Sequence, residues 1–124
     1  MKAMFSHIML GASDVETSRV FYDAALGALG LAPAVKDPKG RYFYVTEGGI
    51  FAITAPIDHQ PATHANGSTI GFAAESPAAV DAWHAAGLAN GGSLCEDPPG
   101  LRQNGMYVGY LRDPAGNKIC ALYR

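Results

Sequence analysis

Hydrophobic and polar residues alternate along the first part of the chain, in the stretch SHIMLGA at residues 6–12. Ile8 and Leu10 fall on one side of an extended segment, while His7 and Met9 fall on the other. This alternation predicts a strand with one face on a core. His7 then lies on the face that points away from that core.

A helical pattern follows the predicted strand. Apolar and small residues recur at helical spacing over residues 18–29, so we expect an amphipathic helix. Ser13 can cap its start, with Glu16 reaching back to complete a capping box. Gly27 and Gly30 offer left-handed positions at which the helix can stop.

Two β-rich runs complete the first half of the chain. RYFYV (41–45) and GGIFAITA (48–55) are separated by TEGG, which indicates a hairpin. The pattern is therefore β-α-β-β, with room for one further short strand near residues 31–36. A stretch rich in Pro and small polar residues comes next and indicates a linker.

The second half repeats the first. Residues 68–92 align without a gap on residues 6–30, at a shift of 62, so that Ile70 matches Ile8 and Trp83 matches Phe21. Ser76 and Pro77 supply the start signals of a second helix. Residues 105–123 hold two alternating strands around the turn RDPAGN, where Pro114, Gly116 and Asn117 favour a tight turn.

This duplication predicts two modules that share one core. Module one spans about residues 1–57, the linker about 58–67 and module two about 68–124. A chain of 124 residues is long enough for one compact domain. The aromatic residues at helical spacing, Phe21, Tyr22 and Trp83, are expected to pack in the core.

The composition of the chain limits the classes of partner that we expect it to bind. The chain is 48% hydrophobic and 16% charged, with a net charge of −2, which gives no electrostatic footprint for nucleic acid or an anionic membrane. It has no apolar run of about 18 residues, so no transmembrane segment is expected. Cys95 and Cys120 form neither a C-x-x-C pair nor a disulfide framework, and we expect a cytoplasmic protein.

Two segments resemble a known superfamily in their order and spacing. HIMLGASDVETSRVFYDAALGALGL (7–31) and VGYLRDPAGNKICALY (108–123), with its D-P-x-G-N turn, resemble the vicinal oxygen chelate superfamily of glyoxalases, bleomycin-resistance proteins and extradiol dioxygenases. The resemblance implies an α+β fold in which two βαβββ modules curl an eight-stranded mixed sheet into a cup, with the helices on the convex side. In this family four inward residues hold a divalent metal, which acts as a Lewis acid.

The four metal positions of the family are only partly filled by metal-binding residue types. The resemblance places them at His7, Ala52, Thr69 and Cys120, of which only His7 and Cys120 could bind a metal. A catalytic metal usually needs about three protein ligands, so a complete family site is not expected, although Fe, Mn, Ni or Zn stays open as a cofactor. Glyoxalase I activity is not expected either, because the missing carboxylate is also the family's base.

His7 and Cys120 each have a second interpretation. Strand alternation puts His7 in the cup with Ala52, Thr69 and Cys120, where it could act as an acid–base group, a ligand contact or a metal ligand. It could equally be satisfied by a neighbouring backbone group. Cys120 could instead be a small buried hydrophobic residue.

Further candidates for ligand binding follow from the resemblance and from residue type. Arg102, Gln103 and Tyr107 lie in a loop that borders the cup mouth in related proteins, where they could recognise a carboxylate or carbonyl group. The alternative is a solvated loop. Tyr44 and Thr69 are the other candidates, and for Tyr44 the alternative is packing in the sheet.

Two functions stay open at this point. One is a binding module that takes up a small oxygenated or aromatic molecule in the cup without a complete metal site. The other is a metal-dependent lyase, isomerase or dioxygenase acting on a vicinally oxygenated small molecule. Fold alone does not separate them. A homodimer is expected, because open sheet edges can be covered by a second chain.

Overall fold

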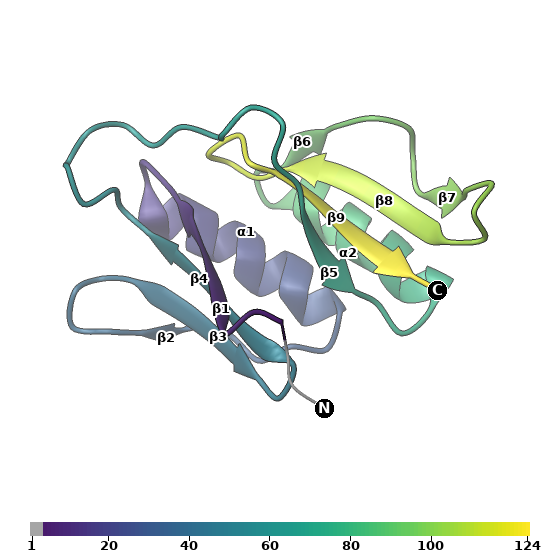
Figure 1. The fold of residues 1–124 in the computed structure, drawn as a ribbon, viewed down its shortest axis with the longest axis horizontal. Coiled ribbons are helices and arrows are strands. Elements are labelled where there is room, and N and C mark those ends of the chain that lie inside the picture. The colour runs from purple at the N-terminus through teal and green to yellow at the C-terminus, as the bar shows by residue number, and fades with distance from the viewer. Residues whose placement is uncertain (1–3) are drawn as a thin grey trace.

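The computed structural model describes residues 4–124, and Figure 1 shows two sheets with both helices on the same side of them. In chain order the elements are β1 (His7–Gly11), α1 (Val15–Ala28), β2 (Val35–Lys36), β3 (Tyr42–Thr46), β4 (Gly49–Thr54), β5 (Ile70–Ala73), α2 (Pro77–Ala89), β6 (Ser93–Leu94), β7 (Gly100–Leu101), β8 (Tyr107–Arg112) and β9 (Lys118–Tyr123). No helix within these residues is long and apolar enough to cross a membrane.

Each module forms its own mixed sheet. Sheet A has the strand order β1-β4-β3-β2, and sheet B has the order β5-β9-β8-β6 with β7 also paired to β8. In each sheet the first strand of the module is parallel to the last one, while the remaining pairs are antiparallel. β1 and β5 end their sheets, and no ladder joins them within residues 4–124. The strands thus form two sheets, where one continuous eight-stranded sheet was predicted.

The predicted duplication is confirmed. α1 begins at residue 15 and α2 at residue 77, which reproduces the shift of 62 found in the sequence. The short strand expected near residues 31–36 is β2. Module two carries one additional short strand, β7, in the segment that was expected to be a loop.

The start of α1 differs from the prediction. Asp14 caps this helix by accepting a hydrogen bond from the Thr17 N–H at 3.1 Å. The Ser13 hydroxyl oxygen instead accepts the Ala62 N–H from the linker at 2.9 Å, so it is not available for the helix. At the other end, Gly30 takes the left-handed conformation with φ of 94°. The cap of α2 is confirmed, since the Ser76 hydroxyl accepts the Ala79 N–H at 3.0 Å.

The core lies between the sheets and the helices, and both modules contribute to it. Phe21, Tyr22 and Trp83 are fully buried, as predicted. The two helices pack on each other where α2 carries Gly87. A Cβ atom at this position would collide with the Leu111 side chain and lie 3.1 Å from Cε1 of Phe21. The missing side chain therefore sets the close approach of α2 to α1 and β8.

The D-P-A-G-N turn joins the two modules. Asp113 is buried and accepts a hydrogen bond from the Tyr22 hydroxyl of α1 at 2.5 Å. The side-chain amide of Asn117 donates to Asp113 at 2.9 Å and to the Gly11 carbonyl at the end of β1 at 3.1 Å. Gly116 takes a positive φ of 92°, as the turn signal indicated. We call Tyr22, Asp113, Asn117 and Gly11 the clamp.

Candidate functional site

Strand pairing defines an inner and an outer face for each sheet. Ile8 pairs with Phe51 and Ile70 pairs with Ile119, and all four belong to the hydrophobic core or pack against it. The predicted alternation is therefore confirmed for these residues, which face the helices. Their neighbours in the strands point to the outer face, including His7 and Ala52 in sheet A and Cys120 in sheet B.

The four family metal positions offer few donor atoms. Ala52 is fully buried and Thr69 immediately precedes β5, so only His7 and Cys120 carry ordinary metal-binding groups. Within residues 4–124, no three His, Cys, Asp or Glu residues are grouped so that they could hold a metal ion. The residues present therefore do not fit the metal centre that the resemblance implied.

Cys120 lies in an environment that favours the neutral thiol. Burial raises its pKa above the ordinary value, and the nearby Lys118 ammonium only partly offsets this. A Cβ added to Gly71 on β5 would lie 3.1 Å from the sulfur, so the bare glycine makes room for it. Metal ligation needs the thiolate, which this burial disfavours. Cys120 also lines a small cavity of about 280 Å³, together with Leu122 and Arg124.

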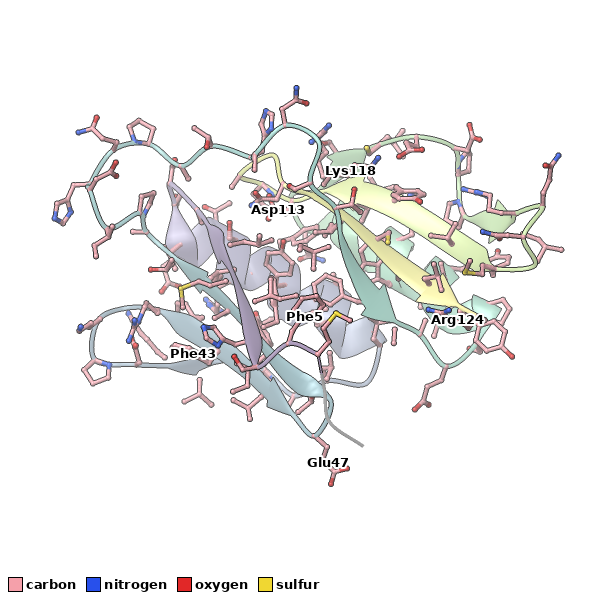
Figure 2. The ribbon with its side chains drawn as sticks, in the orientation of Figure 1. Phe5, Phe43, Glu47, Asp113, Lys118 and Arg124 are labelled. Carbon is pink, nitrogen blue, oxygen red and sulfur yellow. The ribbon has the colours of Figure 1, made fainter. Side chains whose placement is uncertain are left out.

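A larger cavity of about 540 Å³ opens between β1 and β5. Its walls are mainly apolar and come from both modules and from the end of α1; they include Ile8, Leu26, Leu31, Phe51, Ile70 and Phe72. None of its described lining residues is Asp, Glu, Lys or Arg. Phe5, which precedes β1, also lines this cavity and lies between the two sheets in Figure 2. We call this space the inter-sheet cavity.

His7 brings an ionisable group to the inter-sheet cavity. The side chain is exposed, and its Nδ1 is hydrogen-bonded to the Ser6 hydroxyl at 2.8 Å. Its Nε2 has no hydrogen-bond partner within residues 4–124, which leaves this nitrogen for a ligand. His7 and Cys120 line different cavities, and neither cavity includes Ala52.

Tyr44 faces the helices and not the outer face. It pairs with Phe51 across β3 and β4, and its hydroxyl donates to Asp23 of α1 at 2.7 Å. Burial first, and then this hydrogen bond, raise the pKa of Tyr44 far above its ordinary value. Partial burial alone would raise the pKa of Asp23, but hydrogen bonds from Tyr44, Ala34 and Arg19 bring it below its ordinary value. The Tyr44 side chain still forms part of the inter-sheet cavity wall.

The other predicted ligand-binding residues lie elsewhere. The Tyr107 hydroxyl donates to Asp81 of α2 at 2.8 Å, and Arg102 donates to the carbonyl groups of Gly100 and Pro98 in its own loop. Gln103 and Thr69 are exposed. None of these four lines the inter-sheet cavity.

Sequence reasoning missed most of the cavity wall. Phe51 belongs to the core and Phe72 packs against it, yet both also border the space between the sheets. Alternation within a strand reports which face a residue occupies, but not how far apart two sheet edges lie. The one signal in the sequence that could have indicated this cavity was the repetition of aromatic and aliphatic residues in the first strand of each module.

Comparison with known proteins gives the same family by sequence and by structure. The model of the Glyoxalase/Bleomycin resistance protein/Dioxygenase superfamily matches residues 4–121. A glyoxalase/bleomycin resistance protein from Albidiferax ferrireducens T118 is 61% identical to the chain, and the match covers 98% of this chain and 99% of that one, with a TM-score of 0.94. No match was found among the curated proteins.

More distant structures share the fold. A glyoxalase-related enzyme from Fulvimarina pelagi is 24% identical, over 98% of this chain and 88% of that one, with a TM-score of 0.78. Lactoylglutathione lyase from Agrobacterium tumefaciens is 23% identical, over 98% and 94% of the two chains, with a TM-score of 0.68. At these identities the likeness concerns the fold alone.

Proposed function

Because the chain belongs to the glyoxalase/bleomycin resistance protein/dioxygenase superfamily, we propose that it is a small-molecule-binding member whose ligand occupies the inter-sheet cavity. The ligand is uncharged and largely apolar or aromatic, with one oxygen near His7. The single observation that supports this most is the wall of the cavity, which offers aromatic and aliphatic side chains and no Asp, Glu, Lys or Arg among its described members.

The size and chemistry of the cavity support this ligand class. A volume of about 540 Å³ lies in the range of roughly 300–1,000 Å³ that is typical of small-molecule sites. Phe5, Phe51 and Phe72 offer ring faces or edges for stacking. A charged ligand would lose its hydration without gaining an Asp, Glu, Lys or Arg partner among the described lining residues, which costs several kcal/mol. Neutral molecules are therefore preferred.

The family alternative is a metal-dependent lyase, isomerase or dioxygenase. Its donor set is incomplete, since Ala52 provides no ligand atom and Cys120 is buried in its neutral form. We therefore propose binding without a family-type metal centre and derive no step through a metal. The expected curl of the two sheets into a cup, with the helices on the convex side, is also proposed, while the ligand itself lies in the inter-sheet cavity.

Thermal shift with matched probes tests the binding proposal. 4-Methylphenol should raise the midpoint of unfolding in a saturable way, since a ligand that binds only the folded state stabilises it. The similar but anionic 4-methylbenzoate should not. Ile70→Phe fills the cavity and should abolish the shift, whereas Ile57→Phe, at a residue that is 97% exposed, should leave it unchanged. Equal shifts for both probes, or none for either, would contradict the proposal.

Elemental analysis tests the metal question separately. Protein purified without an affinity tag should contain less than stoichiometric Fe, Mn, Ni and Zn. A stoichiometric metal that is lost in His7→Ala but kept in His59→Ala would instead support the enzymatic alternative. His59 is a suitable control because it is an exposed residue of the linker and lies outside the strands of both sheets.

A homodimer and a cytoplasmic location are also proposed. Val35 in β2 and Val45 in β3 are 68% and 69% exposed, at the β2 end of sheet A. A second copy could cover this edge and these side chains. Sedimentation equilibrium should give a dimer that Val45→Lys weakens. The free thiols of Cys95 and Cys120 support a reducing compartment.

A further inference from the structure

The backbone carbonyl groups at the ends of β1 and β5 occupy matching positions in the repeat, but they differ in their hydrogen-bond partners. At the end of β1, the Ala12 N–H donates to Thr54 of β4 at 2.9 Å, so the backbone groups of the preceding residue, Gly11, point away from that strand. The Gly11 carbonyl then accepts the side-chain amide of Asn117 at 3.1 Å. A primary carboxamide thus binds the outward carbonyl of β1.

β5 ends in the same way. The Ala74 N–H donates to Leu122 of β9 at 2.9 Å, so the backbone groups of Ala73 point away from β9 and toward the unpaired edge of sheet B. Ala73 matches Gly11 at the repeat shift of 62. Its carbonyl therefore occupies the position in module two that the Gly11 carbonyl occupies in module one.

The carboxamide of the clamp has no counterpart for Ala73. Gly11 pairs with Thr54 and Ala73 pairs with Leu122, so β4 and β9 match at a shift of 68. This shift places Gly49 at the position that corresponds to Asn117, and glycine has no side chain. Outside the strand pairing of sheet B, the Ala73 carbonyl accepts no hydrogen bond from any group within residues 4–124.

Gly49 and Ala73 both line the inter-sheet cavity. The cavity therefore lies where the repeat would place a second clamp. The clamp partners Tyr22 and Asp113 are likewise matched by other residue types, His84 at the shift of 62 and Val45 at the shift of 68. A backbone carbonyl that borders an apolar cavity gains from a hydrogen-bond donor.

We propose that the inter-sheet cavity selects a neutral aromatic or aliphatic molecule with a primary carboxamide or lactam group, whose N–H donates to the Ala73 carbonyl as Asn117 donates to Gly11. This inference rests on the proposed function, because it names the ligand chemistry of the same cavity. The ring or chain of the ligand lies against Phe51, Phe72 and Ile70. The amide supplies the donor that module two itself lacks at this position.

Calorimetric titration with benzamide and N,N-dimethylbenzamide tests this inference, since the two probes differ by the N–H donors. Benzamide should bind at least threefold more tightly, which corresponds to roughly one net hydrogen bond. Ile70→Phe should abolish both affinities and Ile57→Phe neither. The ¹³C resonance of the Ala73 carbonyl should shift with benzamide and stay in place with the dimethyl compound.

The outcomes separate this inference from the proposed function. Equal affinity for the two amides, or an Ala73 carbonyl that does not respond to bound benzamide, would overturn the carboxamide inference while leaving the neutral-ligand proposal intact if 4-methylphenol still binds. Failure of all three probes to bind would overturn both. The carbonyl measurement uses the unmodified chain, so it does not depend on the folding of a variant.

Discussion

The Tyr22 hydroxyl donates a 2.5 Å hydrogen bond to Oδ2 of Asp113, across 91 residues of sequence. Tyr22 belongs to α1 of module one, and Asp113 begins the turn between β8 and β9 of module two. Both side chains are buried, so the bond forms away from water. It therefore links the two modules through a buried hydrogen bond.

Removing this hydroxyl should destabilise the fold. Tyr22→Phe leaves a buried carboxylate with one donor fewer, and we expect a loss of about 1–3 kcal/mol in the free energy of unfolding. Denaturant unfolding measures it. Tyr107→Phe is the matched control, because its hydroxyl also donates to a carboxylate but at an exposed site, and it should cost less than about 1 kcal/mol. Equal losses would argue against a special role for the clamp.

The same pair makes stability depend on alkaline pH. Burial first, and then the Asp113 carboxylate, raise the pKa of Tyr22 well above its ordinary value of 10.0. As pH rises above about 10, tyrosine ionises in the unfolded chain but not at this site, so the unfolded state is favoured. The stability that depends on Tyr22 should be complete below about pH 10 and decline above it. The stability difference between wild type and Tyr22→Phe should therefore narrow steadily as pH rises above about 10. A constant difference would contradict this linkage.

Two helical glycines should respond in opposite directions to alanine. Gly87→Ala places a methyl group against Leu111 and Phe21, and overpacking of this kind costs about 1–3 kcal/mol, more than the helix propensity that is gained. Gly27→Ala meets no atom within 4 Å and should stabilise the protein by up to about 1 kcal/mol. Thermal unfolding of both variants provides the comparison. Stabilisation by both would show that the helices have room to separate.

The two thiols should react at different rates. Cys120 is buried and its pKa is raised, whereas Cys95 is half-buried, so iodoacetamide should modify Cys95 first. Lys118→Met removes the ammonium group that partly lowers the pKa of Cys120, and it should slow the modification of Cys120 further. Peptide mass spectrometry reports the two sites separately. A Cys120 that reacts as quickly as Cys95 would show that its surroundings open to solvent.

Much of the fold could be predicted from the sequence because its physical signals are local or repeated. Alternation gave the inner and outer faces of β1 and β5, and the shift of 62 gave the second module. The predicted cap of α1 was wrong, because the Ser13 hydroxyl accepts a hydrogen bond from Ala62 of the linker, 49 residues away in sequence. A local sequence pattern does not show that a residue far along the chain competes with the helix for the same hydroxyl group.

The candidate site was predicted less completely. His7 is exposed, but the cavity that it lines includes none of the other three predicted metal positions. Tyr44 takes the alternative that the sequence left open, packing in the sheet, where its hydroxyl donates to Asp23, and it also lines the inter-sheet cavity. The inter-sheet cavity itself depends on the separation of two edges, which no pattern within one strand specifies.

Intermolecular NOE measurement on bound 4-methylphenol tests the central claim most directly, since it locates the ligand without any variant. We predict contacts from the probe to the methyl groups of Ile8, Leu26 and Ile70, which line the inter-sheet cavity from both modules. Contacts confined to exposed Val35 and Val45 on sheet A would place the ligand elsewhere and contradict the account.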